Sequence, residues 1–257
     1  MNKLEIITKI IKIILLISII LFGISFFQKG KLPDKEDVLE QLYQEPLQTE
    51  TDAAPFKTER GGIVYDISPL YDYELYGLIV SYHHSKSWLD YYHGRWKDFI
   101  NIKDICVIWG DNIKTEVYKQ MKFKSGSWTC YSEFKSGVDW RMYSKFKNSC
   151  GSNNHLLSDK EAINKAVMSA KKGDQIYLKG YLVEYSHSDG AWRRGTSISR
   201  TDNKCETIFV TDFQILKKAN PLWHSIYTNT KYSIIGCLVL LIIFFFIPIF
   251  KLSTKIE

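Results

Sequence analysis

Two long apolar segments, one near each end of the chain, constrain the fold more than any other feature of the sequence. Residues 10–27 carry a single charge, that of Lys12, and residues 232–250 carry none. Each segment is close to the length, about 20 residues, that a helix needs to cross the hydrocarbon of a bilayer. The second is apolar on every side, so it has no polar face to turn to water. The sequence therefore predicts two transmembrane helices.

The sidedness of these helices depends on their flanks. Lysines stand on both sides of the two segments in similar numbers, so the positive-inside rule gives no clear preference. The basic start and apolar core of the first segment also fit a cleaved signal peptide, but Phe26 and Phe27 stand where cleavage needs small residues. We therefore expect an uncleaved signal anchor, cytoplasmic tails at 1–9 and 251–257, and an extracytoplasmic middle.

The middle of the chain divides by its local patterns. Residues 28–61, broken by Pro46 and Pro55, predict a linker with a short helix, and residues 219–231 a juxtamembrane segment. Between them, at 62–218, β-branched and aromatic runs alternate with turn signals. The expected strands lie at 63–67, 75–82, 104–109, 127–134, 175–186, 197–200 and 206–216.

Two helices are expected within the domain at 62–218. Apolar residues recur at helical spacing from 87 to 100, including Trp88, Leu89 and Trp96. A second helix follows a capping box formed by Ser158 and Glu161. The prediction is an α+β domain, mainly antiparallel β, with a curled sheet that bends or bulges at Gly180.

Four cysteines lie between the apolar segments: Cys106, Cys130, Cys150 and Cys205. An even number in an oxidising compartment predicts up to two disulfides, with three possible connectivities. Four buried thiols fit the same residues. No C-x-x-C pair is present, which argues against a zinc ribbon.

A histidine cluster is the most metal-like feature of the sequence. His83, His84 and His93, with Asp90 and Asp98 nearby, supply imidazole and carboxylate groups in one region. No H-E-x-x-H or comparable spacing supports the assignment. The alternative is that these polar residues flank an aromatic core face.

Asn153, Asn154 and His155 precede the capped helix. They would face a pocket near the positive helix end, which favours an anion, or they would satisfy loop backbone groups.

A second ligand-binding candidate is the segment that contains Trp192, Arg193 and Arg194. It would hold an acidic or sugar ligand with Trp192 as a stacking face. A solvated hairpin has the same composition.

Several classes of protein are excluded or disfavoured. The net charge of +6 is dispersed along the chain, which argues against a dedicated nucleic-acid binder. The sequence has no P-loop, dinucleotide-binding glycine pattern or G-x-S-x-G elbow, and nothing in it implies a cofactor. All seven tryptophans lie between the apolar segments. Some must be core, and the others suit a protein-binding face.

Two resemblances accompany these patterns. Residues 173–183 (GDQIYLKGYLV) and 206–210 (ETIFV) resemble the closing half of a small OB-like barrel, a fold that often binds oligonucleotides or sugars. The strings at 93–98 (HGRWKD), 104–110 (DICVIWG), 128–130 (WTC), 152–157 (SNNHLL) and 194–197 (RGTS) resemble a group of uncharacterised bacterial two-span membrane proteins. That resemblance implies an inner-membrane location with the main domain in the periplasm.

Three hypotheses for function remain. The first is a non-enzymatic membrane-anchored module that binds or assembles another envelope protein. The second is a metal-dependent envelope enzyme that uses His83, His84 and His93. The third is a membrane-tethered nucleic-acid or nucleotide sensor, which requires a cytosolic domain. The sequence does not give the oligomeric state.

Overall fold

A computed structural model describes residues 3–85, 87, 90–202 and 204–253. Trp88 and Leu89, expected on a helix face, lie outside the described residues. The chain forms two units. One contains both terminal helices, and the other is the domain Leu32–Ala219.

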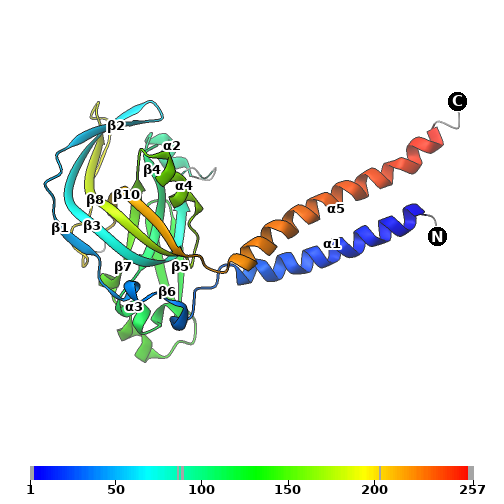
Figure 1. Ribbon diagram of the computed structural model, residues 1–257, viewed down its shortest axis with the longest axis horizontal. Coiled ribbons are helices and arrows are strands. Elements are labelled where there is room, and N and C mark those ends of the chain that lie inside the picture. The colour runs from blue at the N-terminus through cyan, green and yellow to red at the C-terminus, as the bar shows by residue number, and fades with distance from the viewer. Residues whose placement is uncertain (1–2, 86, 88–89, 203, 254–257) are drawn as a thin grey trace. The chain divides into compact units, whose positions relative to one another are not determined.

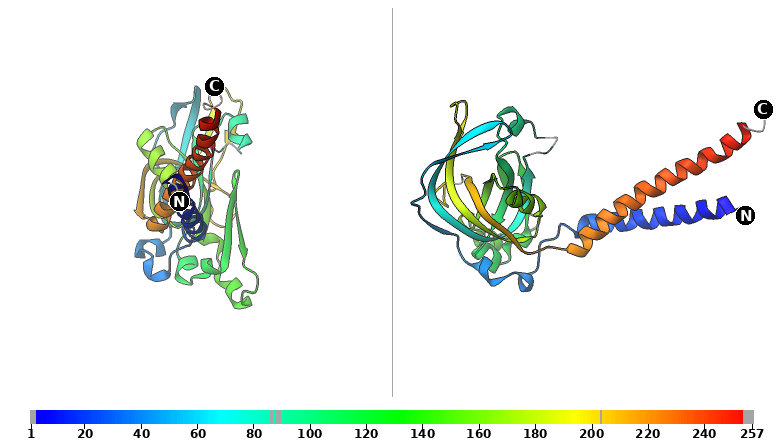
Figure 2. Two further views of the ribbon diagram at one scale, coloured as in Figure 1. Left: turned by 90° about the vertical axis from the view of Figure 1, so that its right-hand side faces the viewer. Right: turned by 45° about the horizontal axis from the view of Figure 1, so that its top comes forward.

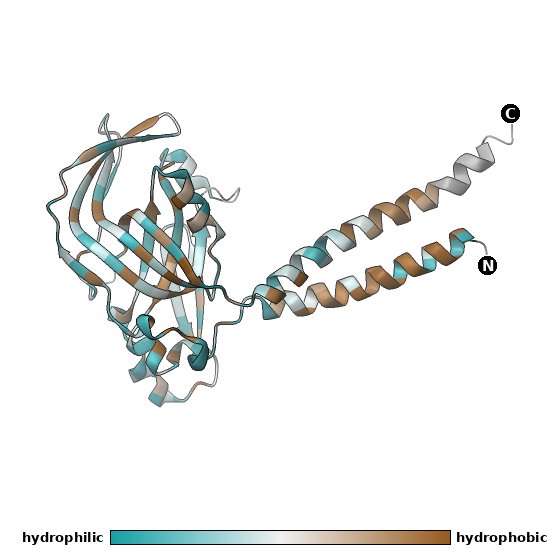
Figure 3. Cartoon of the chain, in the orientation of Figure 1, coloured by the Kyte–Doolittle hydropathy of each residue, from teal (hydrophilic) through white to brown (hydrophobic). Residues whose placement is uncertain are grey.

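The terminal unit consists of two long helices, α1 (Lys3–Gln28) and α5 (Pro221–Ser253). By length and composition both could cross a membrane, and Figure 3 shows hydrophobic residues along much of each helix. Each is longer than its apolar segment because polar residues extend the helix. Within this unit the hydroxyls of Ser18 and Ser233 lie 2.9 Å apart and form a hydrogen bond between the helices.

The domain Leu32–Ala219 is α+β, as expected, and its sheet is mostly antiparallel (Figure 1). Its strands are β1 (Leu47–Glu50), β2 (Phe56–Arg60), β3 (Ile63–His84), β4 (Asn101–Ile108), β5 (Met121–Gly126), β6 (Thr129–Phe134), β7 (Gly151–Leu157), β8 (Gln175–His187), β9 (Arg193–Arg194) and β10 (Glu206–Lys217). Its helices are α2 (Tyr91–Arg95), α3 (Asp111–Lys114), α4 (Glu161–Ser169) and the 3-10 helices η1 (Lys35–Asp37), η2 (Glu40–Tyr43), η3 (Val117–Gln120), η4 (Trp140–Lys145) and η5 (Asn148–Cys150).

The main sheet curls until it closes. Its strand order is β1-β3-β4-β7-β10-β8-β9, and the long strand β3 also pairs with β8 (Figure 2). The pairing of β7 with β10 is parallel. Side chains alternate across each strand, so Ile105 and Val107 of β4 point into the apolar core with Leu156 of β7. Asp104 and Cys106 therefore lie on the outer face of β4, which the separate β5–β6 hairpin approaches.

The predicted bend at Gly180 has a structural counterpart. A β-bulge in β10 shifts the register between Val210 and Asp212, opposite Gly180 and Lys179 of β8. A Cβ atom at Gly180 would lie 2.1 Å from the carbonyl oxygen of Phe209. The two backbones can approach this closely only because position 180 has no side chain.

Several predicted elements differ from the structure. Residues 28–61 are not a simple linker, because β1 and β2 both pair with β3 and the Leu42 side chain is fully buried. The strands expected at 63–67 and 75–82 are one continuous strand, β3, which is long enough to pair with four neighbours. Residues 197–200 form no strand.

Among the described residues of the helix expected at 87–100, only the short α2 is helical. The backbone of Lys97 has φ 51°, which a right-handed helix does not allow, and the Lys97 carbonyl accepts a hydrogen bond from the Tyr65 hydroxyl. The capping box is also absent: α4 begins one residue after Lys160, and the Ser158 hydroxyl accepts from the Lys160 N–H in a local turn.

The two ends of the domain lie side by side. The Lys217 ammonium group donates to the backbone carbonyl of Asp37 over 2.7 Å and to its carboxylate over 3.0 Å. Near the same end, the backbone N–H of Ala219 donates to Asp174 over 2.8 Å. The chain thus enters and leaves the domain at one place.

Candidate functional site

A buried polar network covers the outer face of β4 and β7. The side chains of Asn101, Asp104 and His155 are all at most 1 % exposed. The Asn101 amide donates to Asp104 Oδ1 over 3.0 Å and also to His93 Nε2 over 3.0 Å. Burying these groups costs free energy unless they are paired, so the network is built from groups that satisfy one another.

The pair formed by Asp104 and His155 is the electrostatic centre of this network. His155 Nδ1 lies 2.7 Å from Asp104 Oδ1, across the pairing of β4 with β7. Burial opposes the charge on Asp104, but His155 and Asn101 outweigh burial and lower the pKa of Asp104 to about 2. Burial alone would lower the pKa of His155, but the Asp104 carboxylate raises it to about 8.

The protonation of His155 in this arrangement follows from Arg194. An arginine N–H can only donate, and Arg194 Nη2 lies 2.7 Å from His155 Nε2. His155 Nε2 is therefore an acceptor, and Nδ1 carries the proton that binds Asp104. With Arg194 in this position His155 is neutral and its lone pair is on Nε2; the charged form, which the raised pKa favours, requires Arg194 to leave Nε2.

Trp128, at the turn of the β5–β6 hairpin, closes the network from outside. Its φ of 65° is uncommon for a bulky residue. This backbone conformation lets the Trp128 N–H donate to Asp104 Oδ2 over 3.2 Å while the indole N–H donates to His93 Nε2 over 2.9 Å. The unusual conformation is thus compensated by two hydrogen bonds to buried groups.

The expected histidine metal site is only partly assembled. His83, Asp90 and His93 place ligand atoms within 4.8 Å of one another. His84 follows His83 along strand β3, so it points to the opposite face. Asp98 accepts from the Tyr185 hydroxyl, 3.0 Å from each carboxylate oxygen, and lies 3.9 Å from His93.

The hydrogen bonds of His93 favour a proton over a metal ion in this trio. Two donors, the Trp128 indole and the Asn101 amide, point at His93 Nε2. The proton of a neutral His93 must then be on Nδ1, which lies 2.7 Å from Asp90. A metal ligand needs a free lone pair at that nitrogen, so the arrangement fits a His–Asp–His hydrogen-bond chain.

The other predicted ligand-binding residues are divided between different environments. Asn153 and His155 share the outer face of β7, whereas Asn154 points the other way and donates to the Ile105 carbonyl. These residues form a buried strand and not a loop at the start of a helix.

The arginine-rich segment is likewise divided. Arg194 joins the buried network, and Arg193 is exposed in β9. Trp192 packs against Tyr185 in a T-shaped contact, with ring centroids 5.0 Å apart, so part of its ring is already in contact within the domain.

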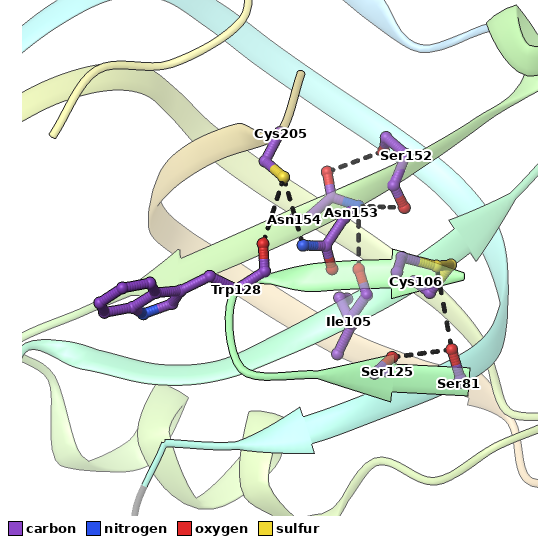
Figure 4. The surroundings of a disulfide bond; sticks show 10 residues. Ser81, Ile105, Cys106, Ser125, Trp128, Ser152, Asn153, Asn154 and Cys205 are labelled. Carbon is purple, nitrogen blue, oxygen red and sulfur yellow. Dashed lines mark hydrogen bonds between the residues drawn. A yellow bond between two sulfur atoms is a disulfide. The ribbon is translucent and has the colours of Figure 1, made fainter. Parts of the chain in front are cut away.

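The cysteines form one disulfide among the described residues, between Cys106 of β4 and Cys130 of β6. It ties the hairpin to the sheet. Cys150 and Cys205 are free thiols. Figure 4 shows Cys205 beside Asn153, whose amide Nδ2 lies 3.4 Å from the Cys205 sulfur.

A hollow of about 220 Å³ lies beside Cys205 and the disulfide. It is lined by Cys106, Cys130, Phe123, Phe146, Asn148, Ser152, Asn153, Arg200, Lys204, Cys205 and Glu206, among others. Two buried oxygens of the lining residues have no hydrogen-bond partner, Asn153 Oδ1 and Glu206 Oε2. Burial raises the pKa of Glu206 to about 8. Unpaired buried polar groups are rare in native proteins, so each calls for a partner such as an ordered water, an ion or a ligand atom.

No protein-family model, curated protein or solved structure matches this chain.

Sequence reasoning missed Asp104, Asn101 and the role of Trp128. One signal was present: Asp104 stands directly before an apolar run in a predicted strand. A charged residue in a buried strand requires a partner. The partner itself was not predictable, because His155 is 51 residues away along the chain.

Proposed function

We propose that this protein is a membrane-anchored binding module of the bacterial inner membrane, with cytoplasmic tails and a periplasmic domain. The length and hydropathy of α1 and α5 support two spans. The Cys106–Cys130 disulfide supports an oxidising compartment for the domain, since such bonds are rare in the cytosol. The same disulfide argues against the cytosolic nucleic-acid sensor.

We also propose that the domain is an OB-like barrel. In support, β3, β4, β7, β10 and β8 form a closed path of five strands that is not in sequence order, as in a Greek-key barrel. Helix α4 connects β7 to β8, the third and fourth of these strands in sequence order. OB folds bind ligands on the face of their second and third strands and on the adjacent loops, and here those strands are β4 and β7.

The main support for a binding function is the Asn153 Oδ1 atom, which has no hydrogen-bond partner and lies in the hollow on this face. Asn153 is only 6 % exposed, so its amide oxygen bears a desolvation cost that a ligand donor would remove. The lining combines hydroxyl and amide groups with Phe123 and Phe146. Hydroxyl groups that donate and accept, placed beside apolar ring faces that stack on aromatic side chains, are what a saccharide offers. We therefore propose a glycan segment as the ligand.

The test is saturation-transfer NMR of the full-length protein in detergent with soluble N-acetylglucosamine oligomers, dextran fragments and heparin fragments. We expect at least one probe to bind and Asn153→Leu to weaken binding about tenfold or more, which corresponds to one lost hydrogen bond. Gln120→Leu, an exposed amide on η3, is the matched control. If no probe binds, or if Asn153→Leu binds as wild type does, the proposal is wrong.

A protein partner is a second candidate, favoured by exposed aromatic side chains near the hairpin. Trp140 is 79 % exposed, and Tyr131 and Tyr143 are more than half exposed. Aromatic residues are enriched where binding energy concentrates. A photo-crosslinking amino acid at position 140 in intact cells tests this candidate: a discrete adduct with an envelope protein supports it, and its absence at positions 131, 140 and 143 contradicts it.

A further inference from the structure

Cys205 differs from the other free thiol of the domain in its surroundings. Cys150 is buried against the apolar core. Cys205 lies immediately before β10 and lines the hollow, and its hydrogen-bond partners include the Asn153 amide, the Trp128 carbonyl and the His155 imidazole. A thiol in a polar hollow is accessible to a ligand bound there.

Cys205, which directly precedes β10, His155 of β7 and Asp104 of β4 form a row of three groups across neighbouring parts of the sheet. Asp104 holds the Nδ1 proton of His155, and the imidazole of His155 is hydrogen-bonded to the thiol. This is the order of nucleophile, base and orienting carboxylate that acyl-transfer enzymes on unrelated folds share. The neutral tautomer of His155 is the one that accepts a proton at Nε2.

The electrostatic surroundings favour the thiolate. Burial raises the pKa of Cys205, but the hydrogen bond with His155, the positive charge of protonated His155 and the hydrogen bond from Asn153 outweigh it, with a smaller contribution from Arg194, so the pKa lies below that of an ordinary thiol. His155 carries this charge once Arg194 has left Nε2. Asn153 Nδ2, close to the sulfur, is also placed to donate to the oxygen of a carbonyl group under attack. The unpartnered Asn153 Oδ1 indicates independently that the hollow takes a ligand.

We propose that Cys205 is a nucleophile that accepts an acyl group from an ester or thioester, with His155 as its base and Asp104 as a positioning residue. The Cys205 proton passes to His155 Nε2, a bond forms between Sγ and the carbonyl carbon, and the bond to the leaving oxygen or sulfur breaks. The leaving group takes the proton from His155, and water then hydrolyses the thioester on Cys205.

Arg194 must move in this reaction, because it occupies the His155 lone pair that receives the proton. Its guanidinium already lies 5.4 Å from the centre of the Trp128 ring, which offers it a second contact. A negatively charged group on the substrate would draw Arg194 away from His155.

The inference rests on the proposed function in one respect, since the same hollow must admit the ligand. The test uses full-length protein in detergent and 4-nitrophenyl acetate as probe. We expect a burst of about one equivalent of nitrophenolate and an acetyl group on Cys205, located by mass spectrometry. His155→Gln should slow acetylation about 100-fold or more, and Cys150→Ser should leave it unchanged.

His155 and Asp104 are buried, so substitutions there can disturb folding. One readout therefore uses the wild-type protein alone. Alkylation of Cys205 by iodoacetamide in wild type provides it: we expect the rate to rise with a midpoint below the ordinary thiol pKa of about 8.5. In folded Asp104→Asn this midpoint should move upward. A midpoint at or above the ordinary value, together with acetylation no faster than that of free cysteine, overturns the inference.

The two proposals fail in different ways. Cys205→Ser should keep oligosaccharide binding and lose acetylation, whereas Asn153→Leu should lose binding. If wild type binds a saccharide probe but is never acetylated on Cys205, the nucleophile is refuted and the binding module stands. If Cys205 is acetylated but no saccharide binds, the glycan ligand is refuted alone.

Discussion

At the scale of single residues, Asp104 shows how a buried charge organises its neighbourhood. Its two carboxylate oxygens accept from His155, from Asn101 and from the Trp128 backbone, which belong to β7, β4 and the hairpin turn. A buried carboxylate with these partners fixes three elements relative to one another. Removing the Asp104 carboxylate would take this acceptor away from all three donors, at a cost of about 1–3 kcal/mol for each group left unpaired.

Glu206 gives a prediction about pH. Its folded pKa, about 8, is higher than the ordinary 4.5, so between these values the native protein holds a proton that the unfolded chain has released. Stability is therefore lost as the pH rises through this window. Glu206→Gln keeps the shape of the neutral acid and should gain stability relative to wild type, on the order of 4 kcal/mol by pH 8.

The measurement is the free energy of urea unfolding of both proteins at pH 4.5, 6 and 8. Glu59→Gln, at an exposed carboxyl, is the control and should give a constant difference. A constant difference for Glu206→Gln as well would show that Glu206 is charged in the fold.

How much of the site could be predicted from the sequence also depends on single residues. Asn153, His155, Arg194, Cys106, Cys130 and Cys205 all stand out as polar or sulfur-bearing residues, and the structure brings them to one face. Their roles were not predictable, because Cys205 and His155 meet only through the parallel pairing of β10 with β7. The local sequence pattern does not indicate which strands, distant along the chain, pair in the sheet.

At the scale of elements, the β5–β6 hairpin depends on its link to the sheet. The Cys106–Cys130 disulfide and the hydrogen bond between the Ser81 and Ser125 hydroxyls attach it to β4 and β3. We expect the double change Cys106→Ser with Cys130→Ser to lower the free energy of unfolding by about 2–4 kcal/mol. Amide exchange of residues 121–134 should accelerate more than that of β8. Equal acceleration throughout would mean that the hairpin is held by other contacts.

Gly180 supplies a second prediction at this scale. An added methyl group would collide with the Phe209 carbonyl, and neither backbone can move without breaking the pairing of β8 with β10. Gly180→Ala should therefore cost about 2–3 kcal/mol or more in thermal or urea unfolding. Gly195→Ala is the matched control, since its nearest neighbour, an oxygen of Glu184, would lie at an ordinary 3.6 Å. A cost at Gly180 no larger than at Gly195 would contradict the close approach.

The elements themselves were predictable to different degrees. Strands β8 and β10 match the patterns at 175–186 and 206–216 because long apolar alternation is a strong signal. Strand β7 was not predicted because Asn153, Asn154 and His155 at its centre are polar, and polar residues do not suggest a buried strand. Hydrogen bonds compensate for the burial of these side chains. The apolar spacing at 87–100 suggested a helix, but the Tyr65 hydroxyl and the strand beginning at Asn101 end it early.

At the scale of the whole molecule, the proposed two spans would place both tails on the same side of the membrane. We predict that protease added to spheroplasts will digest the domain Leu32–Ala219 and spare epitope tags at both termini. Tags should be cleaved only after the membrane is permeabilised. Digestion of a terminal tag in intact spheroplasts would reverse the proposed orientation.

The contact between Asp37 and Lys217 has a consequence for how the domain can be handled. A folded unit whose first and last residues lie together can be inserted into another chain without stretching either partner. Residues 32–219 should therefore tolerate transfer into a surface loop of an unrelated water-soluble host. In that setting the hollow at Cys205 would be open to study with neither detergent nor lipid present.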